Sequence, residues 1–339
     1  GGGTVTIDCN GDNVGFAALD ISGGTGAVIQ GLKIMDSGEE GIRLYGTASG
    51  YQILDCTILN SRTEGIKIEG GSSGGHTVRR CFIGTDGAST IHGNGSHGIY
   101  ISASSNNTIG SQTEAEQNVI CMNNGAGIMI NTLGTGDVAS NNAIYGNYIG
   151  IGADGLTGIP NIRGVYVSAG SADPNSIDNT VIGQLEVTAR NIISGNNTAN
   201  VVLEGATQRN TALYNNYVGT NKDGTVAILA DSSRGIIISN GVEDTLVGGL
   251  VETKRNIISG NDASGIVISS ASNNTIQGNY IGVQPDGETA LGNGGSGIEV
   301  RSPGAAAMDN LIGGSVAGAN IIANNGVNGV RLERATSNV

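Results

Sequence analysis

The sequence predicts an all-β protein folded as a parallel β-helix, a solenoid in which every coil contributes one short strand to each of three sheets. Three observations predict this class. A glycine-apolar-x-apolar motif recurs along the chain, two further short apolar segments follow most copies, and 59 glycines accompany only 4 prolines. Many short strands joined by tight corners favour this composition. Tryptophan is absent and aromatic residues make up 3%, so the core is expected to be aliphatic.

The motif marks the first strand of each coil. In one copy, Ile266 and Ile268 alternate with other residues, which is the period-two pattern of a strand with one face on a core. Ile276 and Ile281 mark two more strands, and Asn279 between them is expected near the left-handed region at a tight corner. Such a coil cannot bury its apolar row alone, so it needs neighbours stacked above and below.

The neighbouring coils are present in the sequence. Copies of the motif begin at Gly41, Gly65, Gly98, Gly127, Gly164, Asn200, Gly235, Gly265, Gly297 and Gly329. They predict about ten coils. From Gly98 onward two kinds of coil alternate, because one carries a loop before its third strand and the other carries a long loop after it. Loops of the first kind are expected at 111–117, 184–190 and 249–255.

Two repeats carry a family resemblance. Residues 274–282 (Asn-Thr-Ile-Gln-Gly-Asn-Tyr-Ile-Gly) and 255–261 (Arg-Asn-Ile-Ile-Ser-Gly-Asn) resemble the parallel β-helix repeats of the pectin-lyase-like superfamily. The likeness covers essentially the whole chain and is greatest to repeat arrays of large secreted or surface-attached bacterial proteins. It implies a right-handed parallel β-helix whose motif strands form the first sheet, with family active sites usually on the outer face of that sheet. The superfamily includes lyases, hydrolases, epimerases, tailspikes and adhesins, so the resemblance predicts a fold rather than one function.

The repeats also predict the domain organisation. A solenoid grows by adding coils, so residues 1–339 are expected to form a single β-helix domain. The chain opens without Met or a signal peptide and closes where another second strand should begin. We therefore expect a fragment of a longer chain.

The net charge of the chain argues against some classes of binding partner. A net charge of -13 argues against nucleic acid and anionic membrane surfaces. No apolar run is long enough for membrane insertion. An acidic, Asn-rich and Lys-poor surface favours an extracellular or cell-surface location, with a carbohydrate polymer or another protein surface as partner. The oligomeric state stays open.

One corner position recurs between the second and third strands of a coil. Asn occupies it repeatedly, at Asn118, Asn191, Asn256, Asn279 and Asn320. Stacked amides at such a position can form a hydrogen-bonded ladder along the solenoid. Cys56 and Cys81 fall at the same position in successive coils, so we expect them to touch, either as free thiols or as a disulfide. The cysteine and histidine spacings predict no metal site and no cofactor.

Asp-Gly pairs recur in the long loops after the third strand. They begin at Asp86, Asp154, Asp223 and Asp286. Asp-Gly is a hairpin signal, so each loop is expected to form a small ribbon that walls one flank of the first sheet's outer face. Calcium binding by these Asp residues is an alternative, but neither an EF-hand spacing nor a calcium-binding β-helix repeat is present.

The outer face of the first sheet can be read from the residue between the two inward positions of each first strand. The row is Asp20, Arg43, Lys67, Tyr100, Met129, Tyr166, Val202, Ile237, Val267, Glu299 and Arg331. It is charged up to Lys67 and apolar from Tyr100 to Val267. A long apolar row on a soluble solenoid is expected to be covered, either by the long loops or by a protein or carbohydrate that stacks on Tyr100 and Tyr166.

The charged half of the row holds the candidate site. Glu40, Glu64 and His97 precede its strands, and Tyr45 and Glu69 follow them. Uronate-cleaving enzymes need cations for a carboxylate and a Lys, Arg, His or Tyr for proton transfer. If the chain is an enzyme, the candidate catalytic residues are Arg43, Lys67, His97 and Tyr100. The candidate binding residues are Asp20, Glu40, Tyr45, Glu64, Glu69, Met129 and Tyr166. The simpler alternative is a solvated ladder of opposite charges.

Two functions remain open at this point. We expect an extracellular β-solenoid segment that presents a long face for carbohydrate binding, adhesion or self-association. The alternative is a secreted polysaccharide lyase or glycoside hydrolase that acts on an acidic polysaccharide. The Asp-Asp, Gly-His-Gly, Arg-Ile-Lys and Asp-Pro-His motifs of the superfamily's enzymes are absent, which argues against a polygalacturonase or an epimerase.

Overall fold

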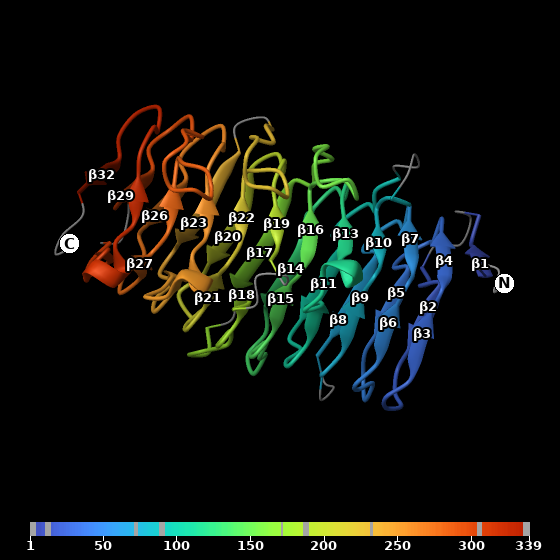
Figure 1. Cartoon of the computed structure of the whole chain (residues 1–339). Coiled ribbons are helices and arrows are strands. Elements are labelled where there is room, and N and C mark those ends of the chain that lie inside the picture. The colour runs from blue at the N-terminus through green and yellow to red at the C-terminus, as the bar shows by residue number, and fades with distance from the viewer. Residues whose placement is uncertain are drawn as a thin grey trace.

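The chain winds into an elongated stack of coils with the two termini at opposite ends (Figure 1). The structure is a computed structural model. It describes residues 5–10, 15–70, 74–87, 92–170, 172–185, 190–230, 233–303 and 307–334. Each coil supplies strands to three sheets in turn, and every neighbouring pair of strands within a sheet is parallel.

The three sheets are named here in the order in which one coil visits them. The first sheet contains β2 (Leu19–Ile21), β5 (Ile42–Leu44), β8 (Ile66–Glu69), β11 (Ile99–Ser102), β14 (Ala126–Thr132), β17 (Arg163–Ala169), β20 (Ala199–Glu204), β23 (Arg234–Ser239), β26 (Ile266–Ser269), β29 (Ile298–Arg301) and β32 (Val330–Glu333). The second contains β3 (Val28–Gln30), β6 (Gln52–Leu54), β9 (Thr77–Arg79), β12 (Thr108–Gly110), β15 (Ala143–Tyr145), β18 (Val181–Gly183), β21 (Ala212–Tyr214), β24 (Leu246–Gly248), β27 (Thr275–Gln277) and β30 (Leu311–Ile312). The third contains β1 (Val5–Asp8), β4 (Leu32–Met35), β7 (Thr57–Leu59), β10 (Phe82–Ile83), β13 (Asn118–Ile120), β16 (Asn147–Ile149), β19 (Ile192–Ile193), β22 (Tyr217–Val218), β25 (Ile257–Ile258), β28 (Tyr280–Ile281) and β31 (Ile321–Ile322).

Short 3-10 turns mark the loops between the second and third strands of alternate coils. They are η1 (Glu114–Glu116), η3 (Glu252–Lys254) and η4 (Val316–Gly318). η1 and η3 lie in two of the predicted loops, and the central part of the third, residues 186–189, lies outside the described residues. None of the helices in the described part of the chain is long and apolar enough to cross a membrane.

The predicted register of the first sheet is confirmed. Asp20 pairs with Arg43, Arg43 with Lys67, and Lys67 with Tyr100, and the row continues through every predicted position to Arg331. The residues on either side of this row point inward. Ile266 and Ile268, for example, are completely buried.

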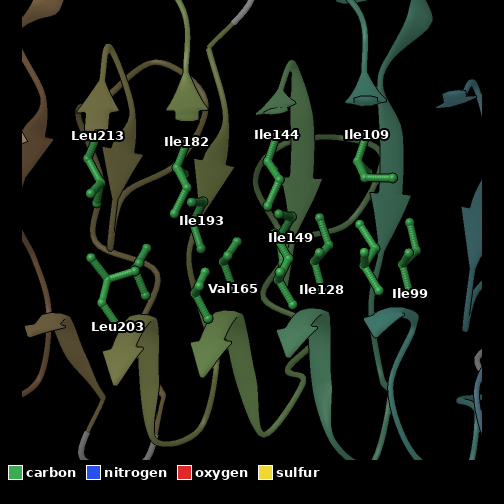
Figure 2. Packing of buried hydrophobic residues seen from close by; sticks show 14 of the residues in the cluster. Ile99, Ile109, Ile128, Ile144, Ile149, Val165, Ile182, Ile193, Leu203 and Leu213 are labelled. Atoms are coloured by element: carbon green, nitrogen blue, oxygen red, sulfur yellow. The ribbon is translucent and has the colours of Figure 1, made fainter. Parts of the chain in front are cut away.

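The core is a set of aliphatic columns that run along the solenoid axis. Figure 2 shows side chains from all three sheets meeting in the interior, among them Ile99, Ile128 and Val165 of the first sheet. All three are fully buried. β-branched side chains suit these positions because they pack well on a pleated surface and lose little rotamer freedom there. A coil is stable only when its neighbours complete these columns.

The predicted Asn ladder is confirmed and is longer than expected. Asn147 and Asn216 join it, so that side-chain amides are hydrogen-bonded from Asn118 to Asn320 at distances of 2.8–3.1 Å. The expected left-handed conformation of Asn279 was wrong. The preceding residue, Gly278, has a φ of 69° instead, because a glycine turns the corner without steric cost and leaves Asn279 extended and buried.

Cys56 and Cys81 continue the same column, as the alignment of coils predicted. Cys81 donates its backbone N–H to Asn118 at 2.9 Å, and both thiols are buried. Both are free rather than joined in a disulfide. Burial raises the pKa of the Cys81 thiol well above its usual range.

A second ladder, which the sequence analysis missed, runs along the corner before the first sheet. It links Asn94, Asn123, Asn161, Asn196, Asn200, Asn261, Asn293 and Asn325. Asn200 is also the one motif copy that does not begin with glycine. Its side chain accepts from Asn196 at 2.9 Å and donates to Asn261 at 2.8 Å. Asn in place of glycine at position 200 therefore connects Asn196 to Asn261, which lie on coils that are not adjacent.

The long loops form a layer outside the third sheet. Antiparallel bridges Ile151–Gly158, Thr220–Ala227 and Val283–Ala290 confirm a ribbon in three of the four Asp-Gly loops. Residues 88–91 of the fourth loop lie outside the described residues. Ile151, Ile159 and Ile228 from these loops pack on the outer side chains of the third sheet, such as Tyr217. An apolar row on the third sheet therefore holds these loops. That the loops also wall one flank of the first sheet stays a prediction.

Candidate functional site

The candidate site lies on the outer face of β5, β8 and β11, where Arg43, Lys67 and Tyr100 are in register. Strands in a sheet are about 4.8 Å apart, so the three side chains span about 10 Å. All three are partly exposed. The structure therefore brings the central predicted residues together on one open face.

Both cations of this face are held in ion pairs. Lys67 Nζ lies 3.1 Å from Glu40 Oε1 and 2.9 Å from Glu69 Oε1, and Arg43 Nη2 lies 2.7 Å from Glu69 Oε2. Burial alone would lower the pKa of Lys67, but its hydrogen bonds to Glu69 and Glu40 outweigh burial and raise that pKa above its ordinary value. The same two cations hold the pKa of Glu69 below its ordinary value despite partial burial. Lys67 is thus a charged partner for carboxylates and a poor general base.

His97 lies two residues before β11 and has hydrogen-bonding and ring contacts of its own. Its Nδ1 accepts the backbone N–H of Ala126 at 2.9 Å, and its ring centroid lies 5.5 Å from that of Tyr100. Burial, aided by the nearby Arg163 charge, lowers the pKa of His97 to about 4. His97 is therefore neutral at pH 7, with its Nδ1 lone pair used and its proton on Nε2.

The remaining acidic candidates divide by burial. Glu40 is 4% exposed and Glu64 is 9% exposed, so neither presents its carboxylate freely to solvent. Asp20 is exposed and accepts the Tyr45 hydroxyl at 3.4 Å. The Arg43 guanidinium carbon lies 4.3 Å from the centroid of the Tyr45 ring. Tyr45 is thereby held beside the ion pairs rather than left mobile.

Several residues of the apolar half of the row are buried within the chain, as expected for a long apolar row. Met129 and Val202 are 6% exposed and Val267 is 1% exposed. Tyr166 stays partly open, with its hydroxyl donating to Glu204 at 2.7 Å and Arg163 lying 4.8 Å from its ring centroid. Burial, reinforced by Glu204, raises the pKa of Tyr166. The partly exposed aromatic groups of the face are therefore Tyr45, Tyr100 and Tyr166.

Other charged residues from the same stretch of sequence do not reach this face. His76 is fully buried at a corner, where its Nδ1 accepts the backbone N–H of Tyr51 at 3.2 Å. Arg80 pairs with Asp55 at 2.6 Å and with Glu116 at 2.7 Å, away from β8. Closeness in sequence overstated the charge of the site, because a coil distributes its residues over three sheets.

The structure adds a cleft at the C-terminal ends of β5, β8 and β11. It has a volume of about 530 Å³, and it is lined by Tyr45, Gly46, Glu69, Gly70, Ser102, Ala103, Gly136, Asp137 and Val138. One wall is the loop that follows β14, in which Asp137 Oδ2 accepts the backbone N–H groups of Leu133 and Gly134. The polar, glycine-containing insertion 133–138 between first and second strands was a sequence signal for this wall.

The described residues contain no group of three or more His, Cys, Asp or Glu side chains suited to a metal ion. Asp154 and Asp286 bind their own loops instead, each accepting from a Thr hydroxyl and from backbone N–H groups. These contacts give each Asp the turn-stabilising role expected of Asp-Gly loops.

Three parallel sheets wound into successive coils define a parallel β-helix protein. The chain belongs to the family described as the right-handed beta helix region, which matches residues 1–182. Its fold is accordingly the right-handed parallel β-helix of the pectin-lyase-like superfamily, as the resemblance implied. The sequence matches none of the curated proteins.

Several solved structures share the fold. The A-module of the mannuronan C-5 epimerase AlgE6 from Azotobacter vinelandii has a TM-score of 0.53 and 14% identity, over 92% of this chain and 75% of that one. The periplasmic alginate epimerase AlgG has a TM-score of 0.49 and 14% identity, over 98% and 83%. The Dettilon tailspike protein has a TM-score of 0.47 and 15% identity, over 92% and 60%. At these identities the likeness is one of fold.

Proposed function

We propose that this chain is a non-catalytic β-helix segment that binds carbohydrate along the outer face of the first sheet. Tyr45, Tyr100 and Tyr166 would supply aromatic platforms, on which the apolar faces of sugar rings pack. The carboxylates and hydroxyls around them would accept and donate hydrogen bonds to sugar hydroxyls. The long, regular face would engage several units of a polymer at once.

One observation carries the non-catalytic part of the proposal. The two cations that a uronate-cleaving site would use, Arg43 and Lys67, are both paired with Glu69, and Lys67 is also paired with Glu40. His97 is neutral, but its Nδ1 lone pair already accepts a hydrogen bond from the backbone N–H of Ala126. A substrate carboxylate would have to break these pairs, and a proton would have no prepared acceptor among these side chains.

The class of ligand has separate support. The fold resembles that of the mannuronan C-5 epimerase module, at a TM-score of 0.53. A protein with this fold can therefore hold a polysaccharide. The acidic composition of the chain, with a net charge of -13, further supports an extracellular or cell-surface location for the segment.

Binding can be tested by affinity electrophoresis in gels that contain neutral or acidic polysaccharides. The wild-type chain should be retarded by at least one polymer. The double variant Tyr100→Ala, Tyr166→Ala should lose that retardation, because it removes two platforms. Tyr145→Ala, on the second sheet, is the matched control and should behave as wild type. Equal retardation of the double variant and the wild type would place any binding elsewhere.

The enzymatic alternative keeps one supporting observation, the contact between His97 and Tyr100 at 5.5 Å on the same face. It predicts unsaturated or newly reducing ends when the protein is incubated with alginate, polygalacturonate or glycosaminoglycans. Our proposal predicts neither product. Turnover that is lost in the variant Lys67→Ala, His97→Ala, Tyr100→Phe would establish a lyase or hydrolase on this face instead.

A further inference from the structure

The cleft between the first sheet and the loop after β14 is a distinct part of the open face. Tyr45 follows β5, and Glu69 and Ser102 are the last residues of β8 and β11; each comes directly after an inward residue, so the three point outward in one column. Gly136, Asp137 and Val138 form the opposite wall. A volume of about 530 Å³ is within the range of small-molecule sites, which is about 300–1,000 Å³.

The charges around the cleft decide what it can hold. Lys and Arg are absent from its described lining, which instead contains the carboxylates of Glu69 and Asp137. The nearest cations of the face, Arg43 and Lys67, are both within 3 Å of Glu69 carboxylate oxygens, and Lys67 is also paired with Glu40, so that the two carboxylates balance the two cations. A uronate unit would bring a third carboxylate into this cleft and would be repelled.

The polar groups of the cleft suit hydroxyl donors. Only Oδ2 of Asp137 is engaged by the amides of its own loop, and Ser102 adds a side-chain hydroxyl. Tyr45 provides an aromatic surface whose position is fixed by Arg43 on the ring and by Asp20 at the hydroxyl. An aromatic platform with several hydrogen-bond acceptors matches an uncharged sugar ring.

We infer that this cleft is a subsite for a neutral sugar unit and that Glu69 makes the face select against uronate polymers. The inference rests on the proposed carbohydrate binding and names its ligand class. Glu69 has two effects that act together. It pairs with both cations of the row, so that neither is free for a uronate, and its own carboxylate lines the cleft.

The experiment measures binding of the full chain to neutral polymers (dextran, mannan and galactan) and to acidic ones (alginate and polygalacturonate) at low and moderate salt. The wild-type chain should bind at least one neutral polymer at least tenfold more tightly than either acidic polymer. Tyr45→Ala should weaken neutral binding at least tenfold, while Tyr145→Ala should not. Circular dichroism melting confirms that each variant is folded.

Glu69→Gln provides the sharper half of the test. It removes the carboxylate that pairs with Arg43 and leaves Lys67 with Glu40 alone, so the affinity for alginate or polygalacturonate should rise at least tenfold and should fall again with added salt. Glu243→Gln, which removes a surface ion pair with Arg209, is the matched control and should cause no such gain.

The outcomes separate this inference from the proposed function. Acidic polymers that bind the wild type as tightly as neutral ones, or Glu69→Gln without a gain, would overturn the neutral subsite while carbohydrate binding stands. Neutral binding that survives Tyr45→Ala unchanged would overturn the placement in the cleft. A wild-type chain that binds no polymer of either kind would overturn the proposed function itself.

Discussion

The outer faces of the third and first sheets show opposite ways of treating a row of large side chains. On the third sheet, coils with a long loop after their third strand contribute an aromatic outer residue, and the coils between them contribute an aliphatic one. The row is Phe82, Val119, Tyr148, Ile192, Tyr217, Ile257 and Tyr280. The chain's own loops cover this row. On the first sheet, Tyr100 and Tyr166 stay partly exposed, Tyr100 in register with Lys67 and Tyr166 in contact with Arg163 and Glu204. The comparison separates a face used for stability from a face available for binding.

The loop layer also explains the two-coil super-repeat. The Asp-Gly loop after β22 packs against its own coil and against the preceding one, since Ile228 joins the cluster that contains Tyr217 and Ile192. Successive loops touch across two coils, since the Lys222 N–H donates to the Gly155 carbonyl at 3.0 Å. One loop therefore covers two coils, and a loop in every coil would have no room.

The glycine of each Asp-Gly pair has a specific reason. Gly224 and Gly287 have φ values of 72° and 75°, and a Cβ on either would lie 2.9 Å from the ring of Tyr217 or Tyr280. A side chain there would be strained and would strike the aromatic ring beneath it. Glycine therefore allows each loop to close over the outer row of the third sheet.

The largest expected loss of stability comes from a charge placed in the core. Ile268→Asp places a carboxylate in the fully buried column behind the first sheet. We expect it to destabilise the protein by more than about 4 kcal/mol, because the charge has no partner there. Urea unfolding monitored by circular dichroism measures this. An unchanged midpoint would mean that the inward register is wrong.

The next prediction compares the two faces directly. Tyr217→Ala should cost about 3 kcal/mol, since it empties space between the third sheet and its loops, where Tyr217 is 7% exposed. Tyr100→Ala, on the open face, should cost less than about 1 kcal/mol. Chemical unfolding of both variants supplies the two values. Equal losses would show that the first sheet is covered as well.

The pH dependence of stability should report the setting of His97. Its folded-state pKa is about 4, whereas an ordinary His has a pKa of 6.5, so the unfolded chain binds the proton first as the pH falls. The contribution of His97 is therefore complete above about pH 6.5 and is lost towards pH 4, by roughly 2–3 kcal/mol.

Unfolding free energies of wild type and His97→Gln across this range test the prediction. The variant should have a flatter profile, while His92→Gln, at an exposed position, should follow the wild type. Parallel profiles for wild type and His97→Gln would contradict the buried, neutral imidazole.

The smallest expected effect concerns the ion pairs of the open face. Glu69→Gln should change stability by less than about 1 kcal/mol, because partly exposed ion pairs contribute little to folding. Thermal melting at low and high salt tests this. A loss above 2 kcal/mol would make the network a structural element rather than a tuned surface.

The repeated period-two pattern predicted a stack of parallel strands and the row from Asp20 to Arg331, because one inward register runs through all the first-sheet strands. Ladder residues such as Asn94 were harder to predict, since Asn is also common at exposed corners. The packing of loops on the third sheet was not predicted, because the aromatic residues that they cover are far apart in the sequence. Phe82 and Tyr148 lie on successive long-loop coils, far apart in sequence, and become neighbours of the loops only in three dimensions.

Only part of the candidate site was predicted, because register is visible in the sequence and side-chain pairing between coils is not. Register placed Arg43, Lys67 and Tyr100 together, but their pairing partners depend on side-chain reach across coils. Glu69 contacts both Arg43 and Lys67, and no periodicity predicts which carboxylate will do so. The cleft beside Glu69 depends on the loop 133–138, whose path the repeat does not specify.

Hydroxyl-radical footprinting of tyrosines, with and without a bound polysaccharide, tests the central claim most directly, since it reads both faces in one measurement. The account predicts that Tyr45, Tyr100 and Tyr166 react in the free protein and become protected by the polymer, while Tyr148 and Tyr217 are protected in both states. Reactive Tyr148 and Tyr217 in the free protein, or first-sheet tyrosines that stay equally reactive under saturating polymer, would contradict it.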